Sequence, residues 1–213
     1  MIEYISRHYD DLLEALGEHL ALVGITFVLS LVFAAILVVL CHYSKTLGNI
    51  LVNVFSVIYS IPSLALFALL IPITGLGEVS AIIVLVIYSQ YLLLRNFLTG
   101  LNEVDPALLE AATGMGMTKM QVLLKIRIPL AKGALFAGIR LTIVATIGIA
   151  TIAASINAGG LGQILFDGLR TMNTPKIVWG SIFAALLAIF ADLILIIAEK
   201  LLGEPHGKRR KEI

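Results

Sequence analysis

The sequence has few charged residues, one cysteine and almost no net charge. Of its 213 residues only 14% are charged, whereas 59% are hydrophobic and the mean hydropathy is +1.01. Soluble domains carry about 25% charged residues, so this composition excludes a water-soluble enzyme with one ordinary core. A formal net charge of +1 gives no basic excess for binding nucleic acid, and Cys41 has no partner for an internal disulfide bond. The composition indicates a membrane protein that crosses the bilayer several times.

The chain also lacks the motifs of catalysis and of phosphate binding. No Gly-x-x-x-x-Gly-Lys-Ser/Thr sequence occurs, so it has no phosphate-binding loop of its own. The four histidines are scattered and do not stand at metal-ligand spacing; they are His8, His19, His42 and His206. We therefore expect no catalytic residue, no bound metal and no cofactor in this chain.

Five hydrophobic runs are long enough to cross a bilayer, which takes roughly 20 residues of helix. They cover approximately residues 20–41, 50–73, 79–97, 128–156 and 177–202. Before them, apolar residues recur at three- and four-residue steps over residues 1–18, which predicts an amphipathic helix. That helix either lies on the bilayer surface or packs on the bundle as a lead-in. The expected fold class is an all-α membrane protein with five transmembrane helices.

The distribution of lysine and arginine predicts the orientation of these spans. With five spans, three of the 15 basic residues fall on the side of the amino terminus and twelve on the other side. Positive charge is retained in the cytoplasm, so we expect the amino terminus outside and the carboxyl terminus inside. Residues 1–18 then form an extracytoplasmic segment, and residues 203–213 form a basic cytoplasmic tail.

The only long cytoplasmic loop, residues 100–127, carries explicit helix signals. Asp105 followed by Pro106 is an N-cap with proline at the first helical position. Thr118 and Gln121 form a capping-box pattern that opens a second short helix. The loop is thus predicted to be a compact helix–turn–helix whose apolar face is buried either against its own bundle or in a groove of a soluble partner.

One motif in this loop is specific. It reads Glu-Ala-Ala, three residues, Gly, nine residues, Ile, one residue, Ile-Pro, and its positions are Glu110, Ala111, Ala112, Gly116, Ile126, Ile128 and Pro129. The run resembles the cytoplasmic signature of permease subunits of binding-protein-dependent ABC importers, with Ile128 in place of the usual leucine. The resemblance covers roughly residues 19–198 and implies the type I ABC importer permease fold.

The resemblance also implies roles and partners. In that family the loop is a coupling helix that docks in a cleft of a cytoplasmic ABC ATPase, which binds ATP and Mg. On this reading Glu110 makes polar contacts to the ATPase, Ala111 and Ala112 allow close approach, and Gly116 provides a tight turn. Ile126 completes the coupling motif, and Pro129 fixes where the loop rejoins the membrane. A second permease copy or a homologous permease, and an extracytoplasmic substrate-binding protein or lipoprotein, complete the expected assembly in a bacterial cytoplasmic membrane.

The stretch 110–162 resembles one subfamily, the osmoprotectant permeases that import glycine betaine, carnitine or choline. Its phrases are Gly-Met-Gly-Met-Thr at 114–118, Ala-Gly-Ile-Arg at 137–140 and Ala-Gly-Gly-Leu-Gly at 158–162. A methionine-type importer permease shares the same plan and is the nearest alternative. From other classes, a secondary carrier or channel would need no ATPase, and a membrane anchor would not need polar residues in its spans.

Polar residues within the spans are candidates for the substrate path. In the second span they recur at steps of three and four, on one helix face, with Pro62 as a kink; they are Asn49, Asn53, Ser56, Ser60 and Ser63. Thr142 and Thr146 form a second candidate wall in the fourth span, which is expected to pack closely or break near residues 157–160. Both stripes could instead be helix–helix seams. Asp192, an acid inside the last span, is either functional or paired structurally with Arg140.

Overall fold

The computed structural model describes residues 2–203, and every regular element in that part of the chain is helical. Of the predicted basic tail at 203–213, only Gly203 lies within the described residues. The elements, in chain order, are α1 (Ile2–Arg7), α2 (Tyr9–Tyr43), α3 (Lys45–Ser60), α4 (Ser63–Thr74), α5 (Glu78–Asn102), α6 (Pro106–Gly114), α7 (Lys119–Val122), a π-helical turn η1 (Leu123–Arg127), α8 (Ile128–Leu130), α9 (Lys132–Ala153), a 3₁₀ turn η2 (Ala154–Ile156), α10 (Leu161–Arg170) and α11 (Thr174–Leu201).

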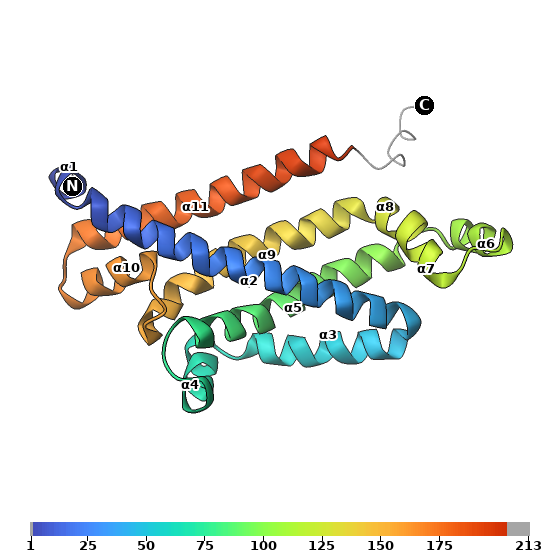
Figure 1. Ribbon diagram of the computed structural model, residues 1–213, viewed down its shortest axis with the longest axis horizontal. Helices are drawn as coiled ribbons and strands as arrows, with labels where there is room; N and C mark the ends of the chain where they lie inside the picture. The colour runs from blue at the N-terminus through green and yellow to red at the C-terminus, as the bar shows by residue number, and fades with distance from the viewer. Residues whose placement is uncertain (1, 204–213) are drawn as a thin grey trace.

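The long helices lie side by side along the long axis of the molecule (Figure 1). Four of them are long and apolar enough to cross a membrane, namely α2, α5, α9 continued by η2, and α11; the pair α3–α4 gives a fifth if it counts as one span. We call the end that bears α6, α7 and α8 the loop end, and the end that bears α1 and α10 the opposite end. The all-α membrane fold expected from composition is confirmed.

The second predicted span, residues 50–73, is not one kinked helix. It consists of α3 and α4, whose axes differ by 98° across a short break. Ile61 is extended (φ −70°, ψ 132°), as the residue before a proline prefers, and Pro62 has no N–H to continue the helix. The Ile61 carbonyl at the break accepts a hydrogen bond from the Tyr88 hydroxyl of α5. The break is therefore held by tertiary structure, and it removes Ser63 from the face of α3.

The other helices begin and end closer to the residues predicted from the sequence. The helix expected in the first residues is present, but from Tyr9 onward it is continuous with the first span, so the two form one 35-residue helix. The fourth span was expected from residue 128, whereas α9 begins at Lys132, after a break at Ala131. The predicted break near 157–160 is confirmed: Asn157 is left-handed, and the Gly160 N–H donates to Glu18 Oε2 at 2.8 Å.

Two hydrophobic clusters form the core. One lies toward the opposite end and includes Leu22, Phe67 and Leu85; the other lies toward the loop end and includes Leu93, Leu94 and Leu123. Helix α5 contributes to both and packs most extensively on α9 and α2. Close approach of α5 and α9 depends on small residues, since a Cβ added at Gly138 would lie 2.7 Å from Asn96 Cβ.

Candidate functional site

The predicted cytoplasmic loop, residues 100–127, which we call the loop segment, folds as its local sequence signals predict. Asp105 caps α6 by accepting the Ala107 N–H on its carboxylate (2.9 Å), and Pro106 occupies the first helical position. Thr118 and Gln121 form the reciprocal capping box of α7: the Thr118 N–H donates to Gln121 Oε1 (2.8 Å), and the Gln121 N–H donates to Thr118 Oγ1 (3.3 Å). These caps fix where both short helices begin.

Gly116 makes the turn between the two helices. Its φ is +84°, a left-handed value that side-chain-bearing residues rarely adopt. A Cβ added there would meet no atom of the described chain within 4 Å. The requirement for glycine therefore comes from backbone conformation and not from crowding within this chain. The turn is closed by the Met117 N–H, which donates to the Ala112 carbonyl at 3.1 Å.

The predicted coupling residues divide between an exposed face and a buried one. Glu110 and Ala111 are exposed, and Met115 beside them is 76% exposed. Ala112, expected to allow close approach to a partner, is only 1% exposed, so its small side chain serves the packing of α6 on its own chain. Ile126 is half-buried against the loop-end core, and Pro129 is exposed.

The loop segment is tied to the α2–α3 turn. His42, near the end of α2, forms a hydrogen bond of 3.0 Å from Nε2 to the Lys119 carbonyl of α7. Because a carbonyl only accepts, Nε2 must carry the proton. This bond joins segments 77 residues apart in the sequence, and periodicity gave no signal for it. A displacement of α7 would be transmitted directly to the end of α2.

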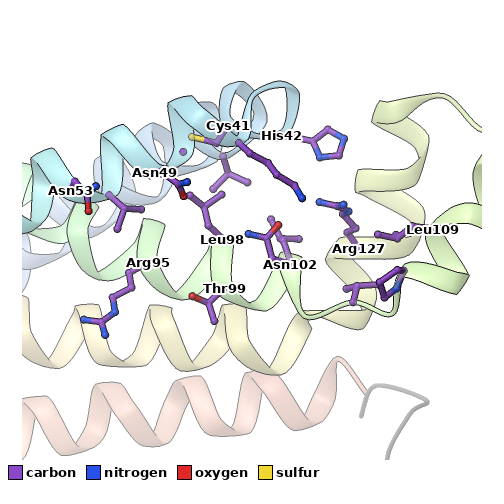
Figure 2. A pocket seen from close by; sticks show the side chains of 17 residues that line it. Cys41, His42, Asn49, Asn53, Arg95, Leu98, Thr99, Asn102, Leu109 and Arg127 are labelled. Atoms are coloured by element: carbon purple, nitrogen blue, oxygen red, sulfur yellow. The ribbon is translucent and has the colours of Figure 1, made fainter.

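A cavity of about 770 Å³ opens beside this tie, between α2, α3, α5 and the loop segment. In Figure 2 Asn49 and Asn53 extend from α3, Arg95 and Thr99 from α5, and His42 and Arg127 lie at the end of the cavity nearest the loop segment. Three basic side chains line it, Lys45, Arg95 and Arg127, and no acidic one does among its described lining residues. The cavity thus joins part of the predicted stripe to the predicted coupling segment.

The structure keeps most of the predicted stripe on α3 together. Asn49, Asn53 and Ser60 are exposed and Ser56 is half-buried. Ser63 was expected on the same face, but this is wrong, because the 98° break places it on α4. The three exposed residues, Asn49, Asn53 and Ser60, lie outside the core of this chain, and polar groups within a span avoid lipid. They therefore line either an aqueous path or a contact with another chain.

The second predicted wall is a seam between helices. Thr142 is fully buried and donates to the Gly138 carbonyl in its own helix (2.8 Å). Thr146 is 3% exposed and lies 3.3 Å from the Ser89 hydroxyl of α5. Of the two alternatives left open by the sequence, the structure favours a hydrogen-bonded seam between α5 and α9.

Asp192 is paired with Arg140. The Arg140 Nε and Nη2 atoms donate to the two carboxylate oxygens at 2.6 and 3.0 Å, a bidentate geometry that links α9 to α11. The ion pair anticipated from sequence is thus present. Its place at the α9–α11 contact, outside the lining of the cavity, supports the structural interpretation of Asp192.

A second polar cavity, of about 810 Å³, lies at the opposite end, between α1, α2, α10 and α11. Lys176 and Arg170 both donate to Asp167 and hold the pKa of this carboxyl below its ordinary value. A depressed pKa means that Asp167 stays ionised across the physiological range. Within residues 2–203 no group of three histidine, cysteine or acidic side chains is placed to hold a metal ion.

Sequence reasoning missed three functional candidates near the first cavity. The sequence did not single out Arg95 as a path residue, but in the structure it lines the cavity and contacts Tyr91. Tyr59 and Tyr91 lie on neighbouring helices with ring centroids 5.0 Å apart. The one signal available was the four-residue step between Tyr91 and Arg95, which places both on one face of α5.

Comparisons with known proteins indicate the same class of protein as the sequence motif in the loop segment. Residues 26–204 match the family described as binding-protein-dependent transport system inner membrane component. The chain is 36% identical over 214 residues to the choline transport system permease protein OpuBB of Bacillus subtilis (strain 168), covering 100% of this chain and 98% of that protein. It is also 36% identical over 213 residues to the glycine betaine/carnitine/choline transport system permease protein OpuCB of the same organism, with 100% and 98% coverage.

Among solved structures, the chain is similar to a chain of the MetNI methionine ABC transporter in an inward-facing conformation. The TM-score is 0.77, the sequence identity is 23%, and the match covers 88% of this chain and 94% of that one. At this level of identity the likeness concerns the fold: helices of a type I ABC importer permease, arranged in the same way.

Proposed function

The chain belongs to the family of binding-protein-dependent transport system inner membrane components, and from this premise we propose that it is the permease subunit of an ATP-driven importer of quaternary-ammonium compatible solutes. Glycine betaine, carnitine and choline are the substrates of this class. The observation that carries the proposal is the 36% identity that spans the whole chain and almost the whole of two permeases named for these compounds.

The chemistry of the named solutes supports one substrate class. Choline, carnitine and glycine betaine share a trimethylammonium group, and they differ in whether a carboxylate accompanies it. Methionine, the substrate of the nearest alternative, has no quaternary nitrogen. Support for methionine comes from a structural likeness at 23% identity, which concerns the fold.

The loop segment is proposed to be the contact with a cytoplasmic ATPase. Its exposed residues Glu110, Ala111 and Met115 form a small mixed face on α6 and the following turn, the kind of short helix that inserts into a groove of a partner. On this proposal the loop end lies in the cytoplasm and the amino terminus outside, which is the orientation that the distribution of basic residues predicts. ATP and Mg are then bound by the partner, and this chain moves in response.

The stripe on α3 is proposed to face the substrate path, with a second permease, identical or homologous, on the far side. Asn49 and Asn53 line the cavity, so this part of the stripe borders open space and not packed side chains. Two such subunits around a two-fold axis would enclose the path. An extracytoplasmic binding protein would deliver the solute at the opposite end.

Reconstitution tests the proposal. The permease is placed in proteoliposomes with the candidate ATPase and binding protein, and ATP-dependent uptake of radiolabelled glycine betaine, carnitine, choline and methionine is measured in turn. We expect uptake of at least one quaternary-ammonium solute and none of methionine. A non-hydrolysable ATP analogue provides the matched control and is expected to support no uptake.

Two results would contradict the proposal in different ways. Uptake of methionine alone would overturn the substrate class while leaving the importer assignment intact. Concentrative uptake by the permease without any ATPase would overturn the importer assignment and favour a secondary carrier.

The tie between His42 and Lys119 gives a prediction for coupling. Replacing His42 by phenylalanine removes the 3.0 Å hydrogen bond but keeps a planar ring, so α7 is held less firmly against α2. We expect the ratio of solute transported to ATP hydrolysed to fall about threefold, the size of one net hydrogen bond. His42→Gln, which retains a donor, should stay near wild type. Equal ratios for both variants would show that the tie plays no part in coupling.

A further inference from the structure

The basic side chains that line the first cavity have no anionic partner in this chain. Lys45, Arg95 and Arg127 line it, and within residues 2–203 none of them forms an ion pair with a carboxylate. Glu103 and Asp105 flank the lining in sequence but are not part of it, and the Asp105 carboxylate caps α6. An anion that balances this positive charge must therefore come from outside the chain.

Arg127 differs from the other arginines in the described part of the chain. Three of those pair with a carboxylate and one bonds to a tyrosine hydroxyl; they are Arg7, Arg140, Arg170 and Arg95. Arg127 is half-buried, yet within residues 2–203 it forms no hydrogen bond or ion pair, and its Nε atom is buried without a partner. Buried donors are nearly always bonded in folded proteins. The five unused N–H donors of this guanidinium thus indicate a missing acceptor.

The cavity offers the place for this acceptor. In Figure 2 the Arg127 guanidinium points from the loop segment into the cavity, whose volume is about 770 Å³. A water molecule there would accept a hydrogen bond but would leave the positive charges unbalanced. An anion does both. A planar guanidinium fits the oxygens of a carboxylate or a phosphate, with two donors directed at one group.

The level of the cavity in the membrane favours a phosphate. Its loop-end lining comes from points where spanning helices end or begin: Lys45 starts α3, Asn102 ends α5, and Arg127 lies just before α8. Tyr43, next to Lys45 in this turn region, is 54% exposed, and exposed aromatic side chains are enriched at the membrane–water interface. The phosphate groups of lipid headgroups lie at this level.

An apolar face on α3 runs from the cavity toward the middle of the membrane (Figure 1). Ile50, Val54 and Val57 stand at steps of four and three, so they share one face of the helix, and all three are exposed. Ile50 and Val54 directly follow Asn49 and Asn53, which line the cavity. A soluble phosphate would use only the basic side chains, whereas a phospholipid would use both the basic side chains and the apolar face.

We propose that the loop-end part of this cavity is a binding site for a phosphate group, and that the phosphate is the headgroup phosphate of an anionic phospholipid. Arg127 and Lys45 pair with the phosphate, and an acyl chain lies along Ile50 and Val54. Basic pockets between spanning helices bind anionic headgroups in this way. The lipid would connect the loop segment to the start of α3. The inference goes beyond the proposed function, since it concerns a membrane ligand and requires no particular solute.

Native mass spectrometry of the purified permease complex tests the site, because it counts the lipids that stay bound. The complex is supplied with equal amounts of phosphatidylglycerol and phosphatidylcholine that carry the same acyl chains. We expect the wild type to retain phosphatidylglycerol in excess. Arg127→Gln should lower the ratio of the two lipids about tenfold, the loss expected for a hydrogen-bonded charge pair. Arg127→Lys, which keeps the charge but not the fork of donors, should lie between them.

Lys125→Gln is the matched control. Lys125 lies in the same turn η1, is exposed and does not line the cavity, so its loss removes one positive charge from the same segment and should leave the ratio near wild type. The amount of phosphatidylcholine retained serves as the internal reference for correct folding. The assay uses neither solute nor ATP, so a failure here leaves the importer assignment standing.

A competition arm separates the two sources of phosphate. Inorganic phosphate should displace phosphatidylglycerol no better than sodium chloride of the same ionic strength. Stronger displacement by phosphate would overturn the assignment to a lipid and identify the ligand as a soluble phosphate. Equal retention of the two lipids by the wild type, or equal effects of Arg127→Gln and Lys125→Gln, would overturn the site itself.

Discussion

A permease that carries Gly116→Val is expected to reach the membrane in normal amounts and yet to lose at least about nine-tenths of its ATP-driven uptake. Gly116 has a φ of +84°, and a β-branched residue is a severe outlier there. The strain amounts to roughly 1–3 kcal/mol, and it is relieved only if the turn between α6 and α7 changes shape. Because 1.4 kcal/mol is a factor of ten, a modest distortion of the docking element has a large effect on coupling.

The matched control for this prediction lies two residues away. Gly114 ends α6 without a left-handed backbone, and a Cβ added there also meets nothing within 4 Å. Gly114→Ala and Gly116→Ala therefore add the same atom to the same loop, and only the second is strained. Uptake and ATPase stimulation in proteoliposomes should be near wild type for the first and clearly reduced for the second. Equal behaviour of the pair would refute the conformational explanation.

The parts of the loop that could be predicted from sequence are those set by short-range contacts. The Asp105–Pro106 start of α6 and the Thr118–Gln121 capping box involve residues two or three apart, so their hydrogen bonds follow from the local sequence alone. The burial of Ala112 could not be predicted in this way. It depends on how α6 lies against the rest of the chain. The neighbouring Ala111 is the same type of residue and is exposed.

For the candidate path residues, too, the pattern within one helix could be predicted and the packing between helices could not. Periodicity correctly placed four polar residues on one face of α3, but it extended the face through Pro62 to Ser63. The helix breaks by 98° at Ile61–Pro62, and the Ile61 carbonyl freed there is bound by the Tyr88 hydroxyl, 27 residues away. Arg95 was missed for a related reason. Its place in a cavity with Asn49 and Asn53 arises from the packing of α5 against α3, which no pattern within one helix reveals.

Asp192→Leu is expected to lower the amount of folded permease in the membrane on the order of tenfold. The change removes both carboxylate acceptors of Arg140, at 2.6 and 3.0 Å, and leaves a guanidinium without a partner on a spanning helix. Otherwise α11 packs on the core through apolar residues that are only partly buried, and Gly180 is its one buried residue in the described structure. Loss of the pair should therefore loosen α11 specifically. Fluorescence-detected size-exclusion chromatography before and after heating measures both the amount and the stability.

The double variant Arg140→Leu/Asp192→Leu separates a structural role from a functional one. Replacing both members of an ion pair by apolar residues is often neutral or stabilising, because no charge is left unpaired. We therefore expect the double variant to recover most of the folded permease and most of the ATP-dependent uptake that Asp192→Leu loses. Recovery of the folded protein without recovery of uptake would instead assign the carboxylate a part in transport. In that case the pair would be a contact that opens and closes as α9 and α11 move, since a merely structural pair has no reason to be needed once the fold is restored.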